Sequence, residues 1–270
     1  MWEPGAVNRD SPKPTEGAQA VHRTLALLRC FGDSTNDLSA SDLARRTELA
    51  LSTTHRLLQA MAATGFLEQD SDTARYRLGP SMAELGRIAY HRRELHRAEP
   101  ELAALSQRTG VVADLAVRLG AEAVILVGGS LDGDNRRALR RPLHSTALGK
   151  VLLAWPDPAE REPETLTALT DRTITDPDAL HAELTRVRAA GFAVNDEESA
   201  SGVRTVAVPV LDAADRARFA LALRSTPEVL ASARLGWFAE QAAACASALE
   251  VLLIPPAQRR VAARPPIVAG

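Results

Sequence analysis

Two neighbouring stretches, SASDLARRT (residues 39–47) and LSTTHRLL (residues 51–58), decide how the N-terminal part of this 270-residue chain folds. Each stretch predicts a short helix, and the residues between them predict a tight turn. Ser39, followed three residues later by Asp42, is typical of the capping box that begins a helix. Two short helices joined in this way indicate a helix–turn–helix, whose second helix can enter the major groove of DNA.

The segments on either side complete a small domain over residues 20–80. Before the two stretches, apolar residues spaced three or four apart predict a helix with one buried face. After Gly65, residues 66–69 and 75–78 predict two short strands around a turn, which is typical of a wing. The apolar positions expected to be buried in the first helix are Val21, Leu25, Leu28 and Phe31.

The helix expected over residues 50–63 begins with polar and basic residues, at the positions where a recognition helix meets bases and phosphates. Arginines of the first two helices and of the wing could contact the DNA backbone. The alternatives are that exposed arginines are merely solvated, that His55 packs between helices, and that the helix–turn–helix binds protein. The expected DNA-binding residues are Arg23, Arg45, Leu51, Ser52, Thr53, His55, Arg56, Arg75 and Arg77.

Composition limits the classes of protein that remain. The formal net charge is −2, so affinity for DNA must come from local patches. No apolar run approaches the roughly 20 residues that span a bilayer, and residues 1–19 lack the apolar core of a signal peptide. Cys30 and Cys245 lie far apart on apolar helical faces, which favours buried thiols over a disulfide or a metal site. We therefore expect a cytoplasmic protein with no metal and no cofactor.

Periodicity divides the rest of the chain into a linker and a second domain. Residues 1–19 are expected to be a disordered arm, residues 81–97 a linker helix and residues 257–270 a disordered tail. The linker carries a narrow apolar stripe that favours pairing with a second helix. Within residues 98–256, short β-branched strands alternate with helices, which predicts an α+β fold with a mostly antiparallel sheet. The last helix is expected to begin at Thr226 and Pro227.

Many short motifs, in one order, resemble the IclR family of transcriptional regulators. The N-terminal motifs are VHRTL (21–25), STTHRLL (52–58), TGFLE (64–68) and YRLGP (76–80). The C-terminal motifs are RPLHSTALGKVLLA (141–154), GFAVNDEE (191–198), GVR (202–204) and AVPV (207–210). No single motif is specific, but their shared order over about residues 20–253 is.

The resemblance implies a winged helix–turn–helix, a linker helix and a GAF-like α/β domain that binds a small-molecule effector. It also implies a dimer or tetramer on a double-stranded, palindromic DNA operator, with repression favoured over activation. The chain differs from the acid-binding members of the family at Asn195, Thr205, Ala222 and Arg224. The identity of its ligand therefore cannot be taken from any relative. We expect Arg224 to meet an anionic effector, to pair with an acid among residues 196–198, or to be exposed at its strand end. The effector-binding residues that the resemblance implies are Ala147, Leu148, Asn195, Thr205, Ala222 and Arg224.

Two other function classes remain open. An enzyme could use the acidic run at residues 196–198 with Lys150 and His144, but consecutive strand residues alternate faces and cannot converge on one substrate. There is no nucleophile elbow, P-loop or zinc spacing, and His144 is interpreted as a turn residue and cap, so no catalytic residue is expected. A sensor or assembly protein whose helix–turn–helix does not bind DNA is the alternative. Two residues keep this alternative open. Glu48 occupies the turn position where relatives usually have glycine, and Leu51 occupies a position where relatives often have a polar or basic residue.

Overall fold

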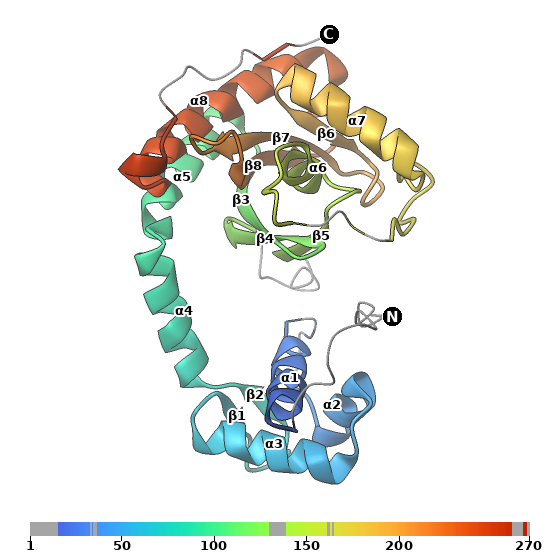
Figure 1. Cartoon of the computed structure of the whole chain (residues 1–270), viewed down its shortest axis with the longest axis vertical. Helices are drawn as coiled ribbons and strands as arrows, with labels where there is room; N and C mark the ends of the chain where they lie inside the picture. The colour runs from blue at the N-terminus through green and yellow to red at the C-terminus, as the bar shows by residue number, and fades with distance from the viewer. Residues whose placement is uncertain are drawn as a thin grey trace. The chain divides into compact units, whose positions relative to one another are not determined.

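The computed structural model describes residues 16–32, 34, 37–129, 139–160, 163, 165–260 and 267–268. It divides the chain into two compact units, residues 1–88 and residues 89–270, with the boundary inside one helix. Figure 1 shows the elements of both units. Each unit has its own buried core.

The first unit is the expected winged helix–turn–helix. Its helices enclose a small apolar core whose centre includes Leu27, Leu43 and Leu58. Tyr76 of the wing is also buried in this core, and a bridge from Leu38 ties it to the segment before the second helix. The elements are α1 (Glu16–Arg29), α2 (Ala40–Thr47), α3 (Leu51–Ala63), β1 (Leu67–Gln69) and β2 (Tyr76–Leu78), with β1 and β2 antiparallel.

The capping prediction for α2 is confirmed. The Ser39 hydroxyl accepts a hydrogen bond from the Asp42 backbone N–H at 3.1 Å and donates one to the Asp42 carboxylate at 2.7 Å. At the other end of α2, Glu48 has a left-handed backbone with φ 55°. The turn therefore adopts the conformation that a glycine would supply, although the residue carries a side chain.

The first helix differs from expectation in its start and in its buried face. It begins at Glu16, so part of the expected arm is helical, and residues 1–15 lie outside the described residues. Leu27 and Phe31 are buried, whereas Val21 and Leu25 are 58% and 49% exposed. The spacing predicted an apolar face correctly, but this unit covers only the C-terminal part of the helix.

The linker helix is shorter than expected. It forms α4 (Pro80–Arg92), with no buried residue, and its apolar positions Leu85 and Ile88 are 50% and 39% exposed. Glu94 then takes a left-handed backbone with φ 56°, which ends the helix before His96. A short 3-10 helix, η1 (Leu95–Arg97), follows and begins the core of the second unit.

The second unit is built on one six-stranded sheet in the order β5-β4-β3-β8-β7-β6, with every pair antiparallel, as the sequence predicted. Among the residues that the structure describes here, one strand and three short 3-10 helices, η1 included, were not foreseen. The strands are β3 (Val112–Leu119), β4 (Glu122–Val127), β5 (Arg140–Pro142), β6 (Ala193–Asp196), β7 (Arg204–Leu211) and β8 (Ala217–Ser225). The helices are α5 (Ala98–Thr109), α6 (Ala147–Ala154), α7 (Pro177–Ala190), η3 (Ser232–Arg234), α8 (Leu235–Leu253) and η4 (Pro256–Gln258).

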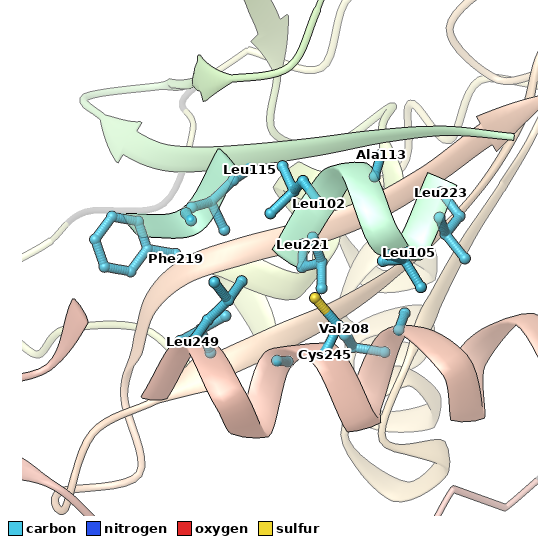
Figure 2. Close-up of a cluster of buried hydrophobic side chains, with 14 of the residues drawn as sticks. Leu102, Leu105, Ala113, Leu115, Val208, Phe219, Leu221, Leu223, Cys245 and Leu249 are labelled. Carbon is cyan, nitrogen blue, oxygen red and sulfur yellow. The ribbon is translucent and has the colours of Figure 1, made fainter. Parts of the chain in front are cut away.

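Helices cover both faces of the sheet (Figure 1). Each face has its own apolar cluster. Helices α5 and α8 cover what we name the α8 face, where Leu115, Val208 and Leu221 meet Leu249 (Figure 2). Burial there raises the pKa of the Cys245 thiol to about 11, so this thiol stays protonated at neutral pH. Helix α6 covers the other face, named the α6 face, and α7 packs against α6.

Three further expectations about this unit are corrected. The edge strand β5 was not predicted, because it holds only three residues and two of them are arginines. The last helix begins at Leu235, since residues 227–230 form a turn and η3 follows. The expected tail is ordered at its start, where Arg260 pairs with Asp215; residues 261–266 and 269–270 lie outside the described residues. Neither cysteine forms a disulfide with a described residue; Cys245 is buried and Cys30 half-buried.

Candidate DNA-binding surface and effector site

Helix α3 has one buried and one exposed side. Thr54, Leu58 and Met61 face the core of the first unit. Leu51, Ser52, His55 and Arg56 are exposed on the opposite side, with Thr53 half-buried between the two. The residues expected to contact bases therefore share one accessible surface, as a recognition helix requires.

The arginines of the first unit fall into two groups. Arg45, Arg75 and Arg77 already have partners: Asp42 at 2.8 Å, the Asp37 carbonyl at 2.7 Å and Glu68 at 2.8 Å, respectively. Arg56 and Arg23 make no hydrogen bond or ion pair with any described residue. An unpaired guanidinium on the exposed side of α3 is free to bind phosphate or guanine. Arg56 is therefore the strongest DNA-binding candidate, and the wing arginines are weaker ones.

Gln59 was not among the expected residues, although it is exposed on the same side of α3. It lies four residues after His55, so the two side chains are neighbours on the helix surface. A glutamine amide can form two hydrogen bonds with adenine, to N6 and N7, in the major groove. Helical spacing alone could have predicted this position.

The residues expected to bind the effector come together on the α6 face. Asn195, Thr205 and Arg224 lie opposite one another on β6, β7 and β8. Ala222 lies two residues before Arg224 and is fully buried. Helix α6, which packs on these three strands, begins with Ala147 and Leu148.

Both polar groups of the Asn195 side chain are hydrogen-bonded within the loop that follows β6. Its Oδ1 accepts a hydrogen bond from the Glu198 N–H at 2.8 Å, and its Nδ2 donates one to the Ser199 hydroxyl at 2.7 Å. The Thr205 hydroxyl, by contrast, has no hydrogen-bond partner among the described residues. Thr205 is thus better placed than Asn195 to meet a ligand without first losing an internal bond.

A buried ion cluster supports the loop after β6. Lys150, which is 1% exposed, donates hydrogen bonds to Glu198 at 2.6 Å, to Glu183 at 3.2 Å and to the Val194 carbonyl at 2.9 Å. Burial raises the pKa of Glu198, and Lys150 offsets this only in part. Burial also opposes ionisation of Glu183, but Lys150 and Arg186 outweigh it and lower its pKa. Lys150 is therefore occupied in holding α6, α7 and this loop together.

Two expectations about side-chain roles are wrong in part. Arg224 pairs with Asp114 of β3, with Nε to Oδ2 at 3.2 Å, rather than with an acid among residues 196–198. His144 lies in the turn before α6, as expected, but it does not cap the helix. It is 3% exposed and hydrogen-bonds the Thr167 carbonyl at 3.0 Å, whereas Thr146 caps α6. In both cases the partner is remote in sequence, so local pattern could not reveal it.

Arg141 is a residue on the α6 face that sequence analysis passed over. It lies opposite the fully buried Ala123, so both side chains are on the same face of the sheet. Burial lowers the pKa of Arg141, and the nearby positive charge of Arg224 lowers it further. Asp114 has the opposite effect on this pKa, so Arg141, Arg224 and Asp114 interact electrostatically.

The two domains of this chain match family models built from known proteins. Residues 20–71 match the family model described as the IclR helix-turn-helix domain, and residues 89–251 match the one described as Bacterial transcriptional regulator IclR C-terminal. The chain belongs to the IclR family of transcriptional regulators. It is therefore a regulator with an N-terminal helix–turn–helix and a C-terminal effector-binding domain, and the alternative of a head that does not bind DNA is not favoured.

Individual IclR-family relatives agree over most of their length. The transcriptional regulator XynR of Escherichia coli K12 is 34% identical over 232 residues, which cover 83% of this chain and 92% of that protein. The transcriptional repressor AllR of Klebsiella pneumoniae is 31% identical over 218 residues, which cover 77% of this chain and 80% of that protein. These relatives are regulators rather than enzymes, which confirms that catalysis is not the function.

Solved IclR-family structures share the fold. An IclR regulator from Alicyclobacillus acidocaldarius has a TM-score of 0.74 at 22% identity, covering 87% of this chain and 98% of that chain. An IclR homolog from Microbacterium hydrocarbonoxydans complexed with 4-hydroxybenzoate has a TM-score of 0.72 at 26% identity, with the same coverage. No helix among the described residues is long and apolar enough to cross a membrane, and no group of described His, Cys, Asp or Glu side chains could hold a metal ion.

Proposed function

We propose that this regulator reads its operator with the exposed side of α3 and responds to a small molecule bound on the α6 face. The observation that carries the first part is the unpaired, exposed guanidinium of Arg56, beside Ser52 and His55 on one helix surface. Arginine hydrogen-bonds guanine through two donors, and serine and histidine can contact phosphates or bases. On this proposal the protein acts in the cytoplasm, where its DNA target lies, with repression as the expected sign.

The protein is proposed to bind its operator as a dimer or tetramer. Support comes from the apolar residues that the first unit leaves exposed: Val21 and Leu25 on α1, and Leu85 and Ile88 on α4. Pairing of such stripes buries apolar area that is otherwise in water. A symmetric dimer would present two α3 helices to the two halves of a palindromic site.

The effector is proposed to contact Leu148, Thr205 and Arg224, with Ala147 and Ala222 leaving room beside them. The Thr205 hydroxyl is the clearest free hydrogen-bonding group among these residues. The Microbacterium hydrocarbonoxydans relative was crystallised with 4-hydroxybenzoate, a small aromatic acid. We infer that this chain also takes a small polar molecule.

The decisive test of the DNA-reading surface is Arg56→Ala. Fluorescence anisotropy on the intergenic DNA beside its own gene, compared with random DNA at two salt concentrations, measures specific affinity. Loss of one base-reading arginine is expected to weaken specific binding by about 1–3 kcal/mol. Arg45→Ala is the matched control, because Arg45 is already paired with Asp42 and a phosphate contact from it would weaken both DNAs alike.

Thr205→Val tests the effector surface in the same assay. Valine keeps the shape of threonine and replaces only the hydroxyl with a methyl group, so operator affinity without effector should not change. The effector concentration that releases DNA should rise about five- to tenfold, the worth of one hydrogen bond. If Thr205→Val releases DNA at the same effector concentration as the unaltered protein, the effector binds elsewhere. If Arg56→Ala binds the operator as tightly as the unaltered protein, Arg56 does not contact the bases.

A further inference from the structure

The first unit carries little free positive charge for a unit that binds DNA. Residues 20–80 contain seven arginines and no lysine, against seven aspartates and glutamates. Three of these arginines have partners within the unit, and a fourth, Arg46, donates a hydrogen bond to the Cys30 carbonyl at 3.2 Å. Affinity for DNA of any sequence comes from neutralised phosphates. The operator affinity of this unit therefore depends mainly on contacts with bases.

Gln59 lies near the centre of the exposed side of α3. At about 100° per residue, Ser52, Arg56 and Gln59 fall within about 60° of one another around the helix axis. They lie roughly opposite Met61, which faces the core of the unit. Gln59 is exposed, and its amide makes no hydrogen bond with a described residue. Both the donor and the acceptor of this amide are thus available to DNA.

The residues around Gln59 leave it room to reach a base. The structure describes all of α3, and the other exposed residues of this helix after Arg56 are Ala60 and Ala63. Each of these alanines carries only a methyl group, so neither holds the helix away from the floor of a groove. Gln59 is therefore the one long polar side chain that α3 offers to DNA after its first two turns.

The spacing of Arg56 and Gln59 matches the spacing of base pairs. The two residues are three apart on α3, so their side chains are neighbours on the helix surface. Three residues rise about 4.5 Å along a helix axis, and stacked base pairs are about 3.4 Å apart. With α3 along the major groove, the two side chains can therefore contact adjacent base pairs.

We propose that Gln59 determines operator specificity by reading an adenine in the base pair next to the guanine that Arg56 reads. The Gln59 amide would donate a hydrogen bond to adenine N7 and accept one from adenine N6. No other single base presents an acceptor and a donor side by side in the major groove. This inference rests on the proposed reading surface of α3 and adds to it the bases that the surface recognises.

The test uses the full chain and a library of random double-stranded DNA. Bound sequences are selected at one salt concentration, and anisotropy then measures affinity for the selected site and for its single-base-pair variants. The unaltered protein should select a G·C pair beside an A·T pair in each half-site. Gln59→Ala should reduce the preference for A·T at that position by about ten- to a hundredfold and keep the preference for G·C.

Gln59→Glu should change the preferred base rather than only weaken the preference. A carboxylate accepts a hydrogen bond from cytosine N4 but has no donor for adenine N7, so this variant should select cytosine at the same position. Gln107→Ala is the matched control. Gln107 is also an exposed helical glutamine, on α5 of the second unit, and its variant should select the same sequence as the unaltered protein.

Three results would overturn the inference. The Gln59 variants could select the same sequence as the unaltered protein, the base that depends on Gln59 could be one other than adenine, or its base pair could lie apart from the one that depends on Arg56. Failure of the proposed reading surface has a different signature. In that case the unaltered protein would select no sequence, or Arg56→Ala would select the same sequence as the unaltered protein.

Discussion

Glu48 shows how one residue can be strained without a change of fold. Its φ of 55° places a side chain in the left-handed region, at the turn between α2 and α3. The conformation persists because the Glu48 and Leu49 N–H groups both donate to the Ala44 carbonyl, which ends α2 as a glycine cap would. The helix–turn–helix therefore keeps its turn, at a cost in conformational energy.

Glu48→Gly should relieve this strain. We expect the free energy of unfolding to rise by about 0.5–1 kcal/mol, because relief of the left-handed strain is partly offset by the greater freedom of glycine in the unfolded chain. Urea denaturation measures the change. Glu48→Ala keeps the Cβ and serves as control, with no stabilisation expected. A glycine variant no more stable than the alanine variant would show that the turn carries no strain.

At the scale of the element, α6 depends on how closely its first turn approaches the preceding loop. A Cβ at Gly149 would lie 2.1 Å from the Leu143 carbonyl oxygen and 2.2 Å from its Cα. Both atoms belong to the backbone, so no side-chain rotation could relieve the clash. Gly149 thus fixes the position of the helix start at Ala147 and Leu148, which the effector is proposed to contact.

Gly149→Ala should therefore displace this loop or α6. A decrease of about 3 kcal/mol in the free energy of unfolding is expected, as for an overpacked core. Gly86→Ala in α4 is the matched control: it has nothing within 4 Å, and it should gain about 0.5–1 kcal/mol from better helix propensity. Denaturant unfolding of both variants measures the difference. A Gly149→Ala variant that is as stable as the unaltered protein, or more stable, would contradict the packing argument.

At the scale of the whole molecule, the proposed assembly depends on α4. None of its residues is buried in the single chain, and Leu85 and Ile88 present apolar side chains three residues apart. An isolated helix of this length is marginal in water unless a face of it is packed. A second copy of α4 would supply that packing.

Leu85→Asp combined with Ile88→Asp should separate the copies. Sedimentation velocity should show a shift toward the monomer, since two carboxylates would be buried without partners. Operator affinity should fall by about a hundredfold or more, because two linked half-site contacts become one. Arg87→Ala, an exposed change on the same helix, should leave the assembly unaltered. An intact oligomer in the double variant would place the interface elsewhere.

The sequence by itself determined what depends on local spacing. Periodicity and capping residues predicted α2, α3, the wing, most of the strands and the antiparallel sheet. The order of short motifs led to the IclR family. Exposure of Ser52, His55 and Arg56 also follows from spacing, because Leu58 and Met61 fix which side of α3 is buried.

The tertiary structure alone decided which remote residues meet. Arg224 pairs with Asp114 across two strands that are 110 positions apart in sequence, and Arg141 reaches the same face through a strand too short to predict. It also decided which apolar residues stay exposed. Val21 and Leu25 follow the same helical spacing as the partly buried Leu28 and the buried Phe31, but they lie beyond the core. Helical and strand periods specify which side chains share a face, whereas partners and burial depend on what the rest of the chain packs against that face.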